Sequence, residues 1–553
     1  MTQMLDALRM LYGTQAEEVL RRIIARYGQG TDPQPVQAPT QADAMLITYG
    51  DTLRRDGEKP LRTLERFLIN HVGSALSAVH LLPIYPYSSD DGFSVIDYHN
   101  VSPALGDWDD VQSLAGHYNL MLDAVINHAS RQSAWFRHYL NGDQPYDSFF
   151  ITCDPAADYT AVVRPRALPL LTRVQTTQGL RMVWTTFSDD QIDLNFRSPE
   201  LLLEILNILL DYAHRGARFI RLDAIGFAWK EPGTSCMNLP QTHALVRLFH
   251  AFLARYVPGT LLITETNVPS EENLAYLGNG HDEADLVYQF PLPPLTLHAF
   301  LAQDATYLTR WAEALPIPEG NATFFNFLAS HDGIGLRPVE GILPEQEVAR
   351  VIEAVQANGG LLSCRDAGNG KQRVYELNIS YIDALTSPDA TDDIRAARFL
   401  AAHTLLLSLA GVPGIYIHSL LGSRNARQEA LDSGVNRRIN RAHLDADELE
   451  TALQNDPLRK RVFIQLIHRL NLRRQQPAFH PKAHQQILCM DKRAFCLLRT
   501  AQSQQILAII NVSTETIQLS CSGHDLLSNQ TIQGTLTLGP LQCAWVEQPV
   551  RTA

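Results

Sequence analysis

The chain has 553 residues, of which 45% are apolar and 19% are charged, a composition typical of a large globular protein. Its formal net charge of −13 argues against a nucleic-acid or anionic-membrane partner, because their phosphates would repel the protein. The seven cysteines are scattered without a CxxC pair, which indicates free thiols in a reducing compartment. The N-terminus lacks the apolar block of a signal peptide, so we expect a cytoplasmic protein.

Apolar residues recur at helical spacing through residues 1–28, and a Gly-, Pro- and Gln-rich stretch follows them. The pattern predicts a helical extension and linker over residues 1–44, with the helix docked on the main domain.

From residue 45 onward, short β-rich runs alternate with longer helical ones. Eight such runs predict the parallel strands of a (β/α)8 TIM barrel, whose active site is built at the C-terminal strand ends. The predicted strands are MLITYG, AVHLLPIYP, LMLDAVINH, RFIRLDAIG, LLITETNVP, ADLVYQF, FFNFLASH and GVPGIYI. The long apolar run 399–421 contains Gly, Pro and His, so it predicts a buried helix and a strand rather than a membrane span.

Two connections are too long for simple βα loops. Residues 129–190 follow the third strand and residues 336–396 follow the seventh, and both predict subdomains over the barrel mouth. Short alternating strands after residue 475 predict a C-terminal antiparallel β domain over residues 475–553. The catalytic domain is therefore expected to span residues 45–474.

Three of the predicted strands end in carboxylates. Arg221 and Asp223 lie two residues apart on one strand, so their side chains point to the same face. Glu265 and Asp332 follow the ends of two later strands. The nearby Arg221 cation is expected to keep Asp223 ionised.

These strands, together with MLDAVINH (residues 121–128), resemble in their order the four signatures of the α-amylase superfamily. The resemblance implies that Asp223 is the nucleophile, Glu265 the acid/base and Asp332 a third carboxylate that binds sugar hydroxyls. Retaining glycosidases of this kind hold their two catalytic carboxyl groups about 5–5.5 Å apart. The resemblance also assigns His128 and His331 to hydroxyls of the sugar in the donor pocket.

The segment HLLPIYPYSSDDGFSVIDYH (residues 80–99) resembles the part of sucrose phosphorylases that closes the donor pocket around a single glucose. The resemblance extends over residues 45–553. It implies that Asp90 and Arg441 bind the far side of that glucose. The other implied glucose contacts are the aromatic platforms Phe93 and Phe187 and the amide of Gln191.

RPRALP (residues 164–169) resembles the phosphate-associated loop of the same branch, with Arg166 as the phosphate contact. A guanidinium fork suits that anion, although a solvated surface charge is the alternative interpretation. Asn127 occupies a position that helps to bind calcium in many α-amylases. The sequence has no acidic cluster beside it, so we expect neither a metal nor a cofactor.

Two positions near the acceptor subsite depart from sucrose phosphorylases, which carry a histidine and a glutamine there. This chain has Asn267, and it has Glu376 directly after Tyr375. In these two positions and in its N-terminal extension, the sequence resembles the glucosylglycerate phosphorylases. The expected activity is retaining phosphorolysis of 2-O-α-D-glucosyl-D-glycerate, a hexosyl transfer to phosphate. Glu376 is a difficulty, because a carboxylate would repel glycerate unless it points away or pairs with a base.

Alternatives remain open at this point. They are phosphorylases of sucrose, sucrose 6′-phosphate or glucosylglycerol. A catalytically dead amylase-like accessory protein fits poorly, since the three carboxylates are present. The expected partners are small molecules, an α-glucoside and inorganic phosphate, and the sequence leaves a homodimer open.

Overall fold

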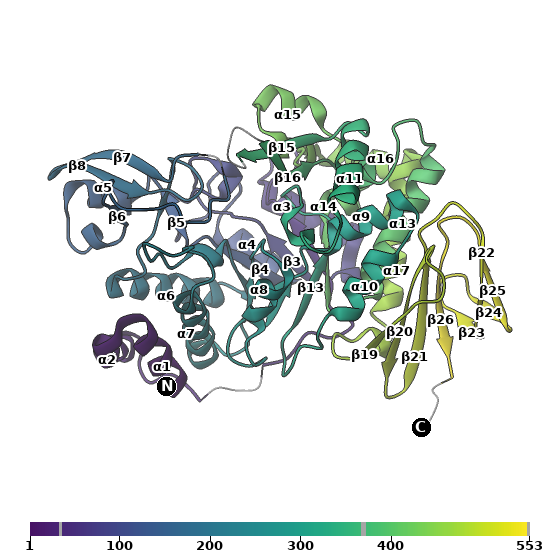
Figure 1. Cartoon of the computed structure of the whole chain (residues 1–553), viewed down its shortest axis with the longest axis horizontal. Helices are drawn as coiled ribbons and strands as arrows, with labels where there is room; N and C mark the ends of the chain where they lie inside the picture. Colours follow the sequence, from purple (N-terminus) through teal and green to yellow (C-terminus); the bar gives the residue numbers. More distant parts are fainter. Residues whose placement is uncertain (33–35, 167, 367–371, 550–553) are drawn as a thin grey trace.

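The computed structural model describes residues 1–32, 36–166, 168–366 and 372–549 (Figure 1). Parts of four predicted segments lie outside the described residues. They are positions 33–35 of the linker, position 167 of the expected phosphate loop, positions 367–371 of the second insertion and positions 550–553 of the C-terminal β domain.

Eight parallel strands close into a barrel in the order β1-β3-β4-β10-β11-β12-β13-β17, and β17 pairs with β1 to complete it. All eight predicted strands are present, and the predicted fold class is confirmed. The strands are β1 (Met45–Thr48), β3 (Ala78–Leu81), β4 (Asn119–Ala124), β10 (Ala217–Leu222), β11 (Leu261–Thr264), β12 (Leu286–Tyr288), β13 (Thr323–Phe327) and β17 (Val412–Tyr416).

The strands are buried almost throughout because helices cover the outside of the barrel. Two of these helices, α6 (Pro199–His214) and α7 (Pro240–Tyr256), each begin with proline, which is preorganised for the first helical turn. The apolar run that raised the question of a membrane span forms the end of α13 (Asp392–Ser408), β17 and α14 (Ile417–Leu420). In the described part of the chain, no helix is long and apolar enough to cross a bilayer.

Both long connections carry secondary structure of their own. The first contains α5 (Ala134–Asn141) and a three-stranded sheet of β6 (Thr152–Cys153), β8 (Gly179–Trp184) and β7 (Leu171–Thr176). The second contains α11 (Glu345–Ala357) and the antiparallel pair β15 (Leu361–Asp366) and β16 (Gln372–Asn378). These insertions confirm the subdomains expected after the third and seventh strands.

The C-terminal residues form an antiparallel sheet in the order β19-β20-β21-β26-β23-β24, at the right of Figure 1. Its strands are β19 (His484–Leu488), β20 (Ala494–Ala501), β21 (Gln504–Asn511), β23 (Gly523–Asp525), β24 (Gln530–Ile532) and β26 (Cys543–Gln548), and there is a separate two-stranded sheet. Trp545 attaches this sheet to the barrel, because its indole Nε1 donates a 2.8 Å hydrogen bond to Ser408 Oγ at the end of α13.

The N-terminal extension is a pair of docked helices, α1 (Thr2–Tyr12) and α2 (Ala16–Tyr27), which lie beside α6 and α7 in Figure 1. The Tyr12 hydroxyl donates to the Phe196 carbonyl at 2.8 Å, and Arg22 pairs with Glu200 at 2.9 Å. Tertiary contacts on the barrel helices therefore hold the extension in place.

Candidate active site

A pocket opens where the C-terminal ends of the barrel strands meet the two inserted subdomains. Its wall contains the three expected catalytic carboxylates and most of the expected binding residues. The predicted residues that it brings together are Asp90, Phe93, His128, Arg166, Phe187, Gln191, Arg221, Asp223, Glu265, Asn267, His331, Asp332, Tyr375 and Glu376. Arg441 lies behind this wall, buried at 5% exposure.

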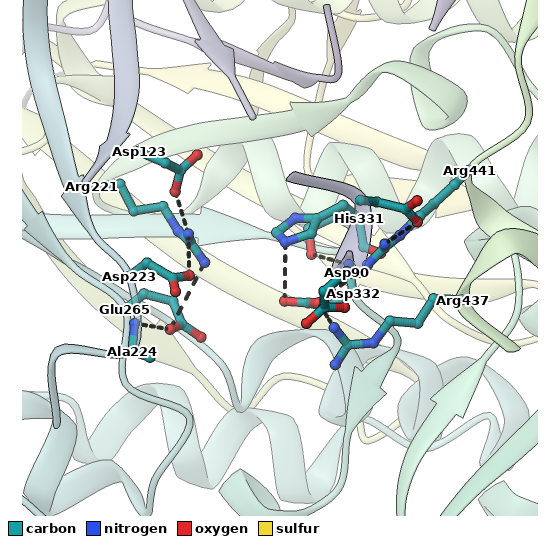
Figure 2. A network of polar contacts seen from close by, with 12 residues as sticks. Asp90, Asp123, Arg221, Asp223, Ala224, Glu265, His331, Asp332, Arg437 and Arg441 are labelled. Atoms are coloured by element: carbon teal, nitrogen blue, oxygen red, sulfur yellow. Dashed lines mark hydrogen bonds and ion pairs between the residues drawn. The ribbon is translucent and has the colours of Figure 1, made fainter. Parts of the chain in front are cut away.

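Arg221 at the end of β10 links two carboxylates on one side of the site (Figure 2). Its Nη1 atom donates to Asp223 Oδ1 at 2.8 Å and also pairs with Asp123. Asp123 in turn contacts His80 Nε2 at 2.7 Å. The sequence analysis missed Asp123, although a charged residue inside the apolar strand LMLDAV was a usable signal.

Glu265 approaches the same cluster from the neighbouring strand. Its Oε2 atom accepts the Ala224 N–H at 2.9 Å and lies 3.9 Å from Arg221 Nη2. Ala224 adopts the left-handed conformation, with φ of 49°, directly after the expected nucleophile. This unusual turn aims the Ala224 N–H at the carboxyl group of Glu265.

Burial raises the pKa of Glu265, and it raises the pKa of Asp223 well above its usual value. Arg221 opposes that rise at each carboxyl, while the charge of Asp332 adds to it at Glu265. The guanidinium of Arg221 is much closer to Asp223 than to Glu265. Arg221 therefore favours the ionised form of Asp223 more than that of Glu265, against the effect of burial.

Asp332 stands across the pocket in a second charged cluster (Figure 2). Arg437 Nη1 pairs with Asp332 Oδ1 at 2.6 Å, and Arg437 also forms a two-pronged pair with Glu376, with contacts of 3.1 and 2.6 Å. Burial alone would raise the pKa of Asp332, but Arg437 and its neighbours hold it well below its usual range. Sequence reasoning missed Arg437, because its carboxylate partners are distant along the chain.

Aromatic and imidazole rings line the expected glucose pocket. His331 stacks on Phe93 with ring centroids 4.9 Å apart and planes 6° apart. Burial lowers the pKa of His331 to about 3, so this imidazole is neutral. Phe187 lies 5.3 Å from the ring of His128.

Three hydrogen bonds orient His128 and Gln191 in this pocket. Asn127 Nδ2 lies 3.1 Å from His128 Nδ1, so the other ring nitrogen carries the proton and donates to the Phe93 carbonyl at 2.7 Å. Burial lowers the pKa of His128 and favours this neutral form. Gln191 Nε2 donates to the same carbonyl at 3.0 Å.

The two aspartates of the Asp90–Asp91 segment have different partners. Arg441 pairs with Asp91, at 2.7 Å, and donates through Nε to the His331 carbonyl. The Asp90 carboxylate instead faces Arg166 Nη2 at 2.9 Å and Gln191. Asp90 and Arg441 therefore lie at the same end of the pocket but form ion pairs with different residues.

The expected acceptor and phosphate residues lie at the outer part of the pocket. Arg166 is half-buried and lies 5.6 Å above the ring of Phe187, in addition to its pair with Asp90. Asn267 is exposed, Tyr375 is half-buried and Glu376 is buried. The contact between Arg166 and phosphate stays a prediction.

A buried cation lies beneath the donor pocket. Lys230 Nζ donates to Asn127 Oδ1 at 2.7 Å and pairs with Asp193 at 2.5 Å. The ammonium group thus contacts the residue that the superfamily resemblance associates with calcium. Within the described ranges, no group of three or more His, Cys, Asp or Glu side chains is arranged to hold a metal ion.

Comparisons with known proteins agree with this geometry. Residues 70–333 match the α-amylase catalytic domain. The chain is 46% identical to a glucosylglycerate phosphorylase from Allomeiothermus silvanus, over 98% of both chains, and 46% identical to one from Escherichia coli, over 92% of both. A sucrose phosphorylase from Agrobacterium vitis is 33% identical, over 79% of this chain and 88% of the relative.

Among solved structures, a sucrose 6F-phosphate phosphorylase from Thermoanaerobacter thermosaccharolyticum matches the fold. The TM-score is 0.76 at 24% identity, and the match covers 90% of this chain and 98% of the other.

Proposed function

The chain belongs to the glucosylglycerate phosphorylase family, and we propose on that premise that it cleaves 2-O-α-D-glucosyl-D-glycerate with inorganic phosphate. The products are α-D-glucose 1-phosphate and D-glycerate. The relatives named for sucrose or glucosylglycerol are only 28–33% identical, against 46–48% for the three glucosylglycerate phosphorylases. The alternatives among related phosphorylases are therefore less well supported.

In the first step, the Asp223 carboxylate attacks C1 of the glucosyl group. Glu265 gives its proton to the glycosidic oxygen, so the C1–O bond breaks and glycerate departs with that oxygen as a hydroxyl group. Asp332, held ionised by Arg437, binds hydroxyls of the distorted sugar opposite the nucleophile. The result is a β-linked glucosyl-Asp223 ester.

In the second step, a phosphate oxygen attacks C1 on the face that glycerate vacated. The ester bond to Asp223 breaks, and Glu265, now a carboxylate, accepts the proton of the attacking phosphate. Two inversions at C1 retain the α configuration.

One observation carries this proposal: a single guanidinium, Arg221, contacts Asp223 directly and reaches Glu265 only at 3.9 Å. This asymmetry favours the ionised form at Asp223 over that at Glu265, as the roles of nucleophile and acid require.

The cellular setting is part of the same proposal. The seven free cysteines support a reducing compartment, and we place the enzyme in the cytoplasm. A homodimer stays a prediction.

The test is to incubate the purified protein with 2-O-α-D-glucosyl-D-glycerate and phosphate and to follow the anomeric products by NMR. We expect α-glucose 1-phosphate and glycerate in equal amounts, and no turnover by Asp223→Ala. Free glucose as the main product, or β-glucose 1-phosphate, would overturn the proposal.

A further inference from the structure

Arg337 differs from the other arginines of the pocket wall in having no carboxylate within ion-pair distance among the described residues. Among the described residues of the pocket wall, Arg365 is the only other arginine without a close carboxylate, since its nearest one is 3.8 Å away. The other three arginines of the wall form closer ion pairs, which are Arg166–Asp90 at 2.9 Å, Arg221–Asp223 at 2.8 Å and Arg437–Asp332 at 2.6 Å. Arg337 is thus an uncompensated cation facing the cavity.

We propose that Arg337 binds the carboxylate of glycerate and so determines the choice of acceptor. This inference rests on the proposed function, and it deepens it by assigning the residue that recognises the charged end of the leaving group.

The position of Arg337 places it on the acceptor side. It begins the short helix η8 (Arg337–Val339), just after β14 (Ile334–Gly335). Gly335 lies so close to Asn267 that a Cβ atom there would sit 3.0 Å from Asn267 Nδ2. Asn267 follows the expected acid/base Glu265 by two residues and borders the predicted acceptor subsite.

The guanidinium of Arg337 is held without being neutralised. Among the described residues its one hydrogen-bond partner is the thioether of Met237, at 3.9 Å, and a thioether sulfur is only a weak acceptor. The side chain is half-buried, and burial lowers its pKa, as does the neighbouring charge of Arg365. The charges of Glu272 and Glu340 oppose this effect from beyond ion-pair distance. The negative charge of an incoming carboxylate would offset both the cost of burying the Arg337 cation and its repulsion by Arg365.

The facing wall does not repel such a ligand. Glu376, the carboxylate expected to oppose glycerate, is 4% exposed and forms its two-pronged pair with Arg437. Its charge is therefore compensated within the wall. Neutral acceptors such as glycerol or fructose would leave Arg337 without the charged partner that glycerate supplies. A half-buried cation left unpaired in this way lowers the affinity for such acceptors.

The experiment loads the enzyme with α-glucosyl fluoride, so that formation of the glucosyl enzyme needs no anion. Transfer to D-glycerate and to glycerol is then measured for the wild type, Arg337→Gln and Arg337→Lys. Arg350→Gln is the matched control, since it removes the same charge from the same insertion at a side chain that is 71% exposed. The rate of α-glucosyl fluoride hydrolysis without an acceptor shows whether each variant is folded and still forms the glucosyl enzyme.

We expect Arg337→Gln to lower kcat/KM for D-glycerate by about thirtyfold or more, a typical loss for a charged hydrogen-bonded pair, while glycerol changes less than about twofold. Arg337→Lys should fall between, because it keeps the charge but loses the fork. Equal losses for both acceptors, or an unchanged rate with glycerate, would overturn the inference. A wild-type enzyme that fails to transfer to glycerate would instead count against the proposed function.

Discussion

At the scale of single residues, the position of Arg221 distinguishes the two neighbouring carboxyl groups, Asp223 and Glu265. Arg221 forms direct ion pairs with Asp123 and Asp223 but lies farther from Glu265. Asp123 is fully buried and also contacts His80, so it fixes the guanidinium from behind. The positive charge of Arg221 is therefore held in a fixed position next to Asp223, where it favours the ionised carboxylate.

Glu265→Gln should fail selectively, because the amide has no proton to give to the glycerate oxygen. Fluoride is a good leaving group that needs less acid assistance, so α-glucosyl fluoride should still load Asp223. We expect a loss of at least about a hundredfold with glucosylglycerate and a much smaller loss in the first turnover with the fluoride, measured by fluoride release. Asp223→Ala is the control and should lose both reactions. If Glu265→Gln loses both equally, Glu265 is not the acid.

Arg437→Gln should move the acidic limb of the pH profile. With Arg437 present, Asp332 stays ionised far below neutral pH, because the cation outweighs the effect of burial. Without it the pKa of Asp332 rises, so Asp332 takes up a proton at higher pH and activity is lost earlier as the pH falls.

The measurement is kcat/KM for phosphorolysis as a function of pH, and we expect an upward shift of the acidic limb of at least about one unit. Arg427→Gln, which alters an exposed arginine nearby, should leave the limb in place. A limb that does not move in Arg437→Gln would show that Asp332 does not depend on this pair.

At the scale of elements, the barrel could be predicted because each strand is a local pattern: an apolar β-rich run that ends in polar groups. The signatures around Asp223, Glu265 and Asp332 likewise stay within single strands and their following loops. Arg437 and Arg337 could not be found in this way. Their roles depend on loops that meet only after the barrel closes, and no local pattern reports which carboxylate faces which arginine.

The same reasoning explains the Asp90–Asp91 segment. Both residues adopt φ near 50°, so a two-residue turn sends neighbouring side chains to different arginines. Arg441 pairs with Asp91, and the binding of glucose by Asp90 and Arg441 stays a prediction.

The N-terminal helices allow a test of stability apart from catalysis. Leu8 is completely buried where α1 packs on the barrel helices, whereas Met10 on the same helix is 51% exposed. We expect Leu8→Ala to destabilise the protein by about 3 kcal/mol and to lower its melting temperature, with unchanged kcat/KM at room temperature. Met10→Ala should change neither. Equal melting temperatures for the two variants would mean that α1 contributes little to the folded state.

At the scale of the whole molecule, the chain combines a net charge of −13 with a pocket that must take up two anions, glycerate and phosphate. The arginines of the pocket wall resolve this conflict locally, and both insertions contribute them. Arg166 comes from the first insertion, and Arg337 and Arg365 come from the second. The long connections of the barrel thus supply the charge that its acidic surface lacks.

The most direct test of the central claim compares acceptors in the synthetic direction, with α-glucose 1-phosphate as donor and phosphate release as the signal. D-Glycerate should exceed fructose and glycerol by at least about a hundredfold in kcat/KM, roughly 2.7 kcal/mol at the transition state. Fructose equal to or better than D-glycerate would contradict the account and identify the chain as a sucrose phosphorylase with unusual loops.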